Sequence, residues 1–158
     1  MKLFINRDLS SSSEDFVFFD ESGGERYATR RLGSNKIVGI KICGASGKTE
    51  AQIRRFAFGS ANIFVLKARG ARVTLAVVPS KNGAYSNFYG VNWHVCGNIA
   101  TKNFSVIDVD KSVVFSHTRR SKYCELEIAD EKNEIFCVAA AVCVNLINTV
   151  ENRGLMPA

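Results

Sequence analysis

The stretch from Ile135 to Val150, IFCVAAAVCVNLINTV, constrains the fold more than any other part of the chain. Its first ten residues carry no charge and no strongly polar group, so a helix formed there would be apolar, and therefore enclosed, on every side. The run is too short to span a bilayer, which needs about 20 largely apolar residues. Three central alanines favour a helix, and Asp130 is a candidate N-cap. A buried strand is the alternative, although alanines are poor strand formers.

The overall composition is that of an ordinary globular protein. A chain of 158 residues is long enough for one well-packed domain and short for two, so we expect a single domain over residues 1–158. Hydrophobic residues make up 46% and charged residues 23% of the chain, a balance that argues against long disordered regions. The first residues, MKLFINRDL, lack the apolar core of a signal peptide, which predicts a cytoplasmic protein.

The five cysteines predict no disulfide framework. They are odd in number and scattered, and no pair has the C-x-x-C spacing. Cys137 and Cys143 lie inside the apolar run, where we expect them to act as small hydrophobic residues. No residue pattern calls for a cofactor.

Before the apolar run, from Lys2 to Ile128, the sequence alternates short apolar segments with turn residues, as expected for successive strands. Three β-hairpins are indicated early in this region, and their turn glycines are spaced by 23 residues each time: Gly24, Gly47 and Gly70. Residues 79–88 are expected to form a turn-rich connection, and strands resume at Val91. In total, about eleven or twelve strands are predicted.

These two features together predict a mainly β fold, a closed antiparallel barrel of about 12 strands around a central hydrophobic C-terminal helix. A barrel of eight strands is filled by its own side chains, whereas a wider barrel leaves a lumen that something must occupy. A helix in that lumen would meet apolar wall in all directions, which explains its lack of a polar face.

Several segments also resemble the LURP-one-related family. They are the opening KLFINRDL, the unit FVFFDESGGERY, the aromatic segment YGVNWHVCGN and the ending YCELEIADEKNEIFCVAAAVCVNLI. The resemblance runs from Lys2 to about Val150 and rests on pattern and order, since the family has no catalytic signature to transfer. It implies the tubby-like barrel that phospholipid scramblases share, with twelve strands around a hydrophobic C-terminal helix.

For most bacterial and plant members of the family, the resemblance implies no established biochemical activity. Better-known relatives of the fold work at membranes, through phosphoinositide binding in tubby proteins and lipid scrambling in scramblases. This sequence shows neither the Pro-rich or palmitoylatable N-terminal extension of scramblases nor a clear calcium loop. The resemblance therefore does not extend to lipid scrambling.

His94 and Cys96 are two residues apart in a predicted strand, so their side chains would lie on one face. His94 and Cys96 could be a metal pair or a base and nucleophile. No further ligand lies at zinc-site spacing, and the only other histidine is His117. Packing residues are therefore the favoured interpretation. A small hydrolase or transferase that uses His94, Cys96 or Tyr123 in a surface groove remains an alternative.

Three other motifs are interpreted as turns or loops. Asp108, Asp110 and Ser112 alternate like the start of a calcium loop, but the required Gly and the final acidic residue are missing, so a hairpin turn is favoured. The segment GASGK, residues 44–48, lacks the length of a phosphate-binding loop and precedes a strand, which again indicates a turn. The serine run from Ser10 to Ser13 is expected to be an exposed loop that could be modified.

Positive charge is the feature that bears most directly on function. The formal net charge of +6 permits an anionic partner, phospholipid or nucleic acid. In a barrel of successive hairpins, the tight turns share one rim and the connections between hairpins share the other. Asp20, Glu21, Asp108 and Asp110 lie in predicted turns, so we expect an acidic cluster on the turn rim. Three arginine pairs lie at strand ends or connections, and we expect them to converge as a basic cluster on one rim: Arg30 with Arg31, Arg54 with Arg55, and Arg119 with Arg120.

The sequence therefore favours a binding or interaction module without enzymatic activity. A barrel filled by its own helix has no interior cavity for a substrate, and no acid, base, metal and nucleophile constellation is evident. The expected partner is an anionic membrane lipid headgroup or a protein, which would place the molecule at the periphery of a membrane. Nucleic-acid binding through the basic rim is a weaker hypothesis, because no RNA-binding motif is recognisable. Alternatively, the arginine pairs are only solubilising charge.

Overall fold

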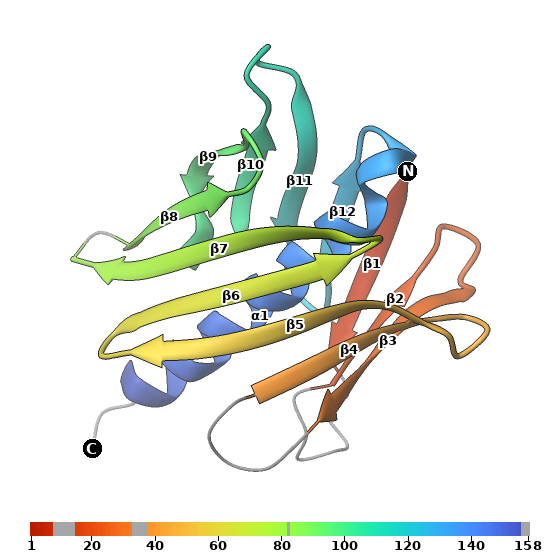
Figure 1. Cartoon of the computed structure of the whole chain (residues 1–158), viewed down its shortest axis with the longest axis horizontal. Coiled ribbons are helices and arrows are strands. Elements are labelled where there is room, and N and C mark those ends of the chain that lie inside the picture. The colour runs from red at the N-terminus through yellow and green to blue at the C-terminus, as the bar shows by residue number, and fades with distance from the viewer. Residues whose placement is uncertain (8–14, 33–37, 82, 156–158) are drawn as a thin grey trace.

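The computed structural model describes residues 1–7, 15–32, 38–81 and 83–155, which form twelve strands and one long helix (Figure 1). The strands are β1 (Lys2–Arg7), β2 (Phe16–Phe19), β3 (Glu25–Leu32), β4 (Val38–Gly44), β5 (Thr49–Phe58), β6 (Ala61–Ala68), β7 (Ala71–Ser80), β8 (Gly83–Tyr89), β9 (His94–Asn98), β10 (Asn103–Ile107), β11 (Val113–Arg119) and β12 (Cys124–Ile128). The helices are the 3-10 turns η1 (Ile99–Thr101) and η2 (Glu131–Asn133) and the α-helix α1 (Glu134–Leu155).

All twelve strands belong to one antiparallel sheet that curls into a nearly closed barrel. The strand order is β8-β7-β6-β5-β4-β3-β2-β1-β12-β11-β10-β9. Consecutive strands in the chain therefore pair, except β8 with β9, and β1 also pairs with β12. This architecture confirms the predicted fold class. The successive hairpins make each pairing local, and the β1–β12 ladder brings the two ends of the strand region together.

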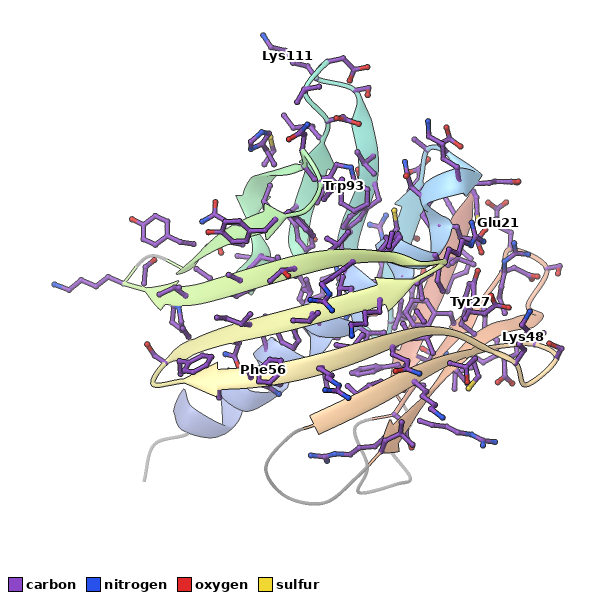
Figure 2. The ribbon with its side chains drawn as sticks, viewed as in Figure 1. Glu21, Tyr27, Lys48, Phe56, Trp93 and Lys111 are labelled. Carbon is purple, nitrogen blue, oxygen red and sulfur yellow. The ribbon has the colours of Figure 1, made fainter. Side chains whose placement is uncertain are left out.

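The barrel departs from full closure at one seam. Among the described residues no hydrogen-bonded ladder joins β8 to β9, although Gly83 of β8 lies so close to Asn98 of β9 that a side chain at Gly83 would clash. The Trp93 ring fills the seam from inside, with its centroid 5.5 Å from that of Phe88 and 6.3 Å from that of Phe115. Figure 2 shows Trp93 between this seam and β11. Side-chain packing therefore replaces the missing ladder.

The helix α1 passes through the barrel behind β5 and β6 in the view of Figure 1. Every residue from Cys137 to Ile147 is buried, against inward-facing residues such as Phe18, Phe64 and Leu75. The apolar run therefore forms the enclosed helix that its composition predicts. The helix continues to Leu155, beyond the apolar run. No helix in the described part of the chain is long and apolar enough to cross a membrane.

The start of α1 is fixed by polar contacts. Asp130 caps η2 by accepting a hydrogen bond from the backbone of Lys132 at 3.0 Å, and η2 leads directly into α1. Glu134 then accepts hydrogen bonds from Arg26 Nε at 3.0 Å, Arg26 Nη2 at 3.1 Å and the Tyr27 hydroxyl. Burial by itself would raise the pKa of Glu134, but these hydrogen bonds outweigh it and lower the pKa. The helix therefore begins with a charged carboxylate bound to β3.

The predicted hairpins are present, but the predicted connection at residues 79–88 is not. Gly47 and Gly70 have φ of 84° and 73°, the left-handed values that favour glycine in tight turns. Residues 79–88 instead belong mostly to β7 and β8. Their polar residues had indicated a loop, but β8 is an edge strand, where Tyr85 and Tyr89 are exposed.

The antiparallel order gives the barrel two different rims. The hairpin rim comprises the turns at residues 20–24, 44–48, 69–70 and 108–112 and the start of α1, at the right and top of Figure 1. The connection rim comprises the later halves of β3 and β5, the turns at 59–60 and 120–123, and η1 with Lys102. Lys81 and Asp15, which follow β7 and precede β2, also lie at the connection rim.

Candidate functional site

The six predicted arginines all lie toward the connection rim. Arg30 and Arg31 are near the end of β3, and Arg119 and Arg120 are at the end of β11. Arg55 faces Val38, the first residue of β4, and Arg54 faces Gly39. The topology thus brings together on one rim pairs that are far apart in the sequence.

The arginines do not form one compact cluster. In the sheet order β3 and β11 are separated by β2, β1 and β12, which is four interstrand steps, or about 19 Å along the sheet at about 4.8 Å per step. The strand order therefore puts the arginine pairs at one rim but spreads them along it. The sequence could not show this, because the β1–β12 pairing that sets the separation is a long-range contact.

Two of the six side chains are also engaged within the protein. Arg55 Nε and Nη2 donate to Asn62 Oδ1 at 3.0 and 2.8 Å, and its guanidinium lies 5.5 Å from the centroid of the buried Phe64 ring. Neighbouring residues of a strand point to opposite faces, so Arg54 is exposed while Arg55 turns toward the interior. Arg120 donates to Glu125 Oε2 at 3.2 Å. Arg30, Arg31, Arg54 and Arg119 are exposed and have no ion-pair partner among the described residues.

The two rims differ in charge. Nine cationic residues whose side chains the structure describes lie at the connection rim: Arg30, Arg31, Arg54, Arg55, Lys81, Lys102, Arg119, Arg120 and Lys122. Only Asp15 and Glu125 offset them there. The hairpin rim carries the four predicted acids together with cations such as Lys48 and Lys111, which project from separate turns in Figure 2. The protein therefore has one strongly basic rim and one mixed rim.

The connection rim contains a cavity that we call the turn pocket, beside the β11–β12 turn. Its volume is about 260 Å³, and it is lined by Ile5, Phe16, Lys102, residues 119–124 and Asn145. None of these described lining residues is acidic. The dense run RRSKYC, residues 119–124, was a signal for it in the sequence. Lys102 and Asn145 could not have been found, because the fold alone brings η1 and α1 to this turn.

The floor of the turn pocket connects to a buried polar network. Asn145 Oδ1 is 3.8 Å from Cys124 Sγ, and Asn145 Nδ2 donates to Ala141 O at 2.8 Å and lies 3.2 Å from His117 Nε2. Burial lowers the pKa of His117 to about 4, so its ring is neutral at neutral pH. Burial raises the pKa of the Cys124 thiol, while the charges of Lys102 and Arg119 oppose that shift.

The residues of the alternative Cys and His site lie at two places in the structure. His94 and Cys96 are exposed on β9, opposite Ile107 and Ser105 of β10. No hydrogen bond joins the two side chains among the described residues. Tyr123 lies elsewhere, in the turn pocket. The three residues are therefore at two separate places on the surface.

The other sequence motifs are turns, as favoured. Asp110 accepts hydrogen bonds from the backbone and hydroxyl of Ser112, and Asp108 accepts from the backbone of Lys111 at 2.9 Å. Gly47 donates to Gly44 O at 2.9 Å and closes the turn before β5. In the described part of the chain no three His, Cys, Asp or Glu residues are grouped as a metal site. Ser10 to Ser13 lie outside the described residues.

Comparisons with known proteins agree with this architecture. A family model described as LURP-one-related matches residues 1–145. The X-ray structure of a protein from Arabidopsis thaliana is similar to this structure, with a TM-score of 0.62 and 12% sequence identity over 93% of this chain and 90% of that chain. At this identity the likeness concerns the fold. A comparison with curated protein sequences finds no match.

Proposed function

The chain belongs to the LURP-one-related family, and from that premise we propose that it is a non-enzymatic module that binds anionic phospholipid headgroups through its connection rim. As such it would be a cytoplasmic protein peripheral to a membrane. A barrel whose lumen is occupied by its own helix favours a surface role over catalysis in an interior cavity.

The observation that carries this proposal is the charge difference between the rims. The described connection rim holds nine cationic and two acidic residues, spread over strands from β3 to β11. Lys and Arg residues near an anionic bilayer each contribute about 1 kcal/mol of attraction. A broad basic rim therefore suits an extended anionic surface, and the mixed rim at the other end would face away from it.

Exposed apolar side chains between these charges support a membrane as the partner. Phe58 at the end of β5 is 64% exposed, and Leu32 and Tyr123 on the same rim are 40% and 37% exposed. Aromatic and aliphatic side chains flanked by cations are typical of surfaces that enter the headgroup region of a bilayer. This arrangement favours a lipid surface over a nucleic acid, whose backbone offers charge without an apolar layer.

The test is co-sedimentation with vesicles of phosphatidylcholine, with and without phosphatidylserine. We expect binding only to the vesicles with phosphatidylserine, weakening as salt is added. The variant Arg30→Glu with Arg54→Glu should lose most of this binding while keeping its melting temperature, because both side chains are exposed and have no ion-pair partner among the described residues. Arg55 is unsuitable for this test, because it is bound to Asn62.

The matched control is Lys48→Glu with Lys111→Glu, which makes the same change of charge on the hairpin rim (Figure 2). It should bind vesicles as the wild type does. If both double variants lose binding equally, the attraction depends only on net charge and the rim has no special role. If the wild type ignores vesicles and shifts a nucleic acid or captures a protein instead, the lipid proposal is wrong.

A further inference from the structure

The turn pocket has a concentration of positive charge that no carboxylate within it offsets. Arg119 and Lys122 have no ion-pair partner among the described residues, and Lys102, the C-cap of η1, adds a third cation to the lining. A fourth cation, Arg120, is held by Glu125 at 3.2 Å. Glu125 itself does not line the pocket. The cavity therefore favours a ligand that carries more than one negative charge.

Neutral hydrogen-bond donors surround the same space. The turn is closed by the backbone N–H of Arg120, which donates to Tyr123 O at 2.8 Å. Within the described residues, the backbone N–H groups of Ser121 and Lys122 have no acceptor, and both Ser121 and Tyr123, which carry hydroxyls, are among the residues that line the pocket. Several donors on the residues that line one small space suit an oxyanion with several acceptor atoms, such as a phosphate.

The opposite wall of the pocket is apolar. Ile5 of β1 and Phe16, the first residue of β2, are each 3% exposed and line the pocket. At about 260 Å³ the pocket is somewhat smaller than the roughly 300–1,000 Å³ of sites for drug-sized ligands. It has space for a phosphate group and a few further atoms that would lie against Ile5 and Phe16.

The cations that line the pocket, Lys102 and Arg119, influence the pKa of the Cys124 thiol in its lining. Burial is the main influence on the Cys124 thiol and raises its pKa, but Lys102 and Arg119 both oppose it. Two residues from different elements, η1 with its cap and β11, therefore direct positive potential to the same place. Asn145 closes the floor with both of its side-chain ends bonded within the protein.

We propose that the turn pocket is a binding site for a phosphomonoester, with Arg119, Lys102 and Lys122 as its charged ligands. A phosphomonoester carries about −1.5 to −2 charges at pH 7 and three terminal oxygens, which matches three cations better than a carboxylate or a phosphodiester does. This deepens the proposed function, on which it rests for the choice of rim, by naming the chemical class of the group bound. The group can come from a lipid headgroup or from a free phosphorylated small molecule.

The first experiment uses the whole protein and a soluble probe, glycerol 3-phosphate, in titration calorimetry without membranes. We expect saturable binding at one site. The variant Arg119→Gln with Lys122→Gln should bind at least about tenfold more weakly, because it removes charge-assisted hydrogen bonds. Lys48→Gln with Lys111→Gln, on the hairpin rim, removes the same number of charges away from the pocket; this matched control should bind as the wild type does.

A gain of affinity gives a readout that structural damage cannot imitate. Glu125→Gln removes the carboxylate that holds Arg120, so it should strengthen glycerol 3-phosphate binding a few-fold. No saturable binding by the wild type, or equal binding by the pocket variant and the control variant, would overturn the proposal.

A second experiment separates the two sources of the phosphomonoester. Vesicles of phosphatidylcholine are mixed with phosphatidic acid, a monoester, or with phosphatidylglycerol, a diester, at matched total charge. If the wild type prefers phosphatidic acid and the pocket variant loses that preference, the ligand is a lipid headgroup. If the wild type binds glycerol 3-phosphate but shows no such preference, the ligand is a free small molecule. If the protein binds both kinds of vesicle equally and does not bind glycerol 3-phosphate, the phosphomonoester site is refuted but the proposed lipid-binding function stands. Soluble binding without any vesicle binding refutes the proposed function but leaves the pocket.

Discussion

Asn145 of the central helix and His117 of β11 are joined inside the barrel, with Asn145 Nδ2 3.2 Å from His117 Nε2. The other ring nitrogen, Nδ1, lies 2.7 Å from Lys102 O and so carries the proton that it donates there. Because Asn145 Nδ2 also donates to Ala141 O, it acts as a donor, and Nε2 must accept. This contact therefore requires a neutral imidazole.

The first prediction follows from the lowered pKa of His117, about 4 in the folded protein against about 6.5 in an unfolded chain. Between these values the unfolded state binds a proton that the folded state does not, so stability falls as the pH falls. This residue should make the free energy of unfolding about 2 kcal/mol lower at pH 5 than at pH 7. Urea unfolding at the two pH values measures it.

The control is His117→Gln, which cannot titrate in this range. It should be less stable than the wild type at pH 7 and should lose about 2 kcal/mol less between pH 7 and pH 5. The carboxylates titrate in both proteins, so the difference isolates His117. Parallel pH profiles for the two proteins would show that His117 is not buried as a neutral ring.

The second prediction tests the enclosure of α1. Ala140 is 1% exposed in the barrel interior, so Ala140→Arg would bury an unpaired charge at a cost of several kcal/mol, close to the whole stability of a domain of this size. The variant should be insoluble or unfolded in circular dichroism. Val109→Arg, at a position that is 66% exposed, should fold normally. An unchanged melting temperature for Ala140→Arg would contradict the enclosed helix.

The fold was largely predictable because its two strongest signals are local. The uncharged run around Ala139 to Ala141 requires burial on every side, and only a wide barrel offers that to a single helix. Hairpin turns also depend on a few neighbouring residues, as at Gly47 and Gly70. The rims then follow from the antiparallel order, which is why the arginine pairs could be assigned to one rim.

The parts that could not be predicted depend on long-range packing. The open seam depends on how Trp93 packs on Phe88 and Phe115, and nothing near Trp93 in the sequence specifies that. The inward turn of Arg55 depends on Asn62 and Phe64 of the next strand. The turn pocket combines residues from β1, β2, the cap of η1, the β11–β12 turn and α1, and no local pattern links these elements.

The third prediction concerns the thiols. Cys137 and Cys143 are fully buried, and burial raises the pKa of both, whereas Cys96 is exposed on β9. In the native protein a thiol reagent should label Cys96 first, and Cys137 and Cys143 only after denaturant is added. Cys96→Ser should remove the fast phase. Rapid labelling of Cys137 or Cys143 would mean that the helix opens. Since exposure alone accounts for fast labelling of Cys96, that labelling is no sign of catalysis.

The last prediction addresses how the connection rim meets a membrane. Charge attraction weakens with salt, because the screening length falls to about 3 Å at 1 M ionic strength, whereas an apolar side chain buried in the headgroup region remains bound. Phe58, at the end of β5 on the same strand face as Arg54, is 64% exposed and is the best-placed apolar residue for this role. Phe58→Ser should therefore bind phosphatidylserine vesicles nearly as the wild type does at low salt and dissociate at a lower salt concentration.

The control for this variant is Val109→Ser, which removes an equally exposed apolar side chain from the hairpin rim. Its dissociation should require the same salt concentration as that of the wild type. If Phe58→Ser and Val109→Ser behave alike, the rim is held by charge alone and Phe58 stays in water. If Val109→Ser is the weaker binder, the protein approaches the membrane with its hairpin rim. The orientation inferred from the arginines would then be reversed.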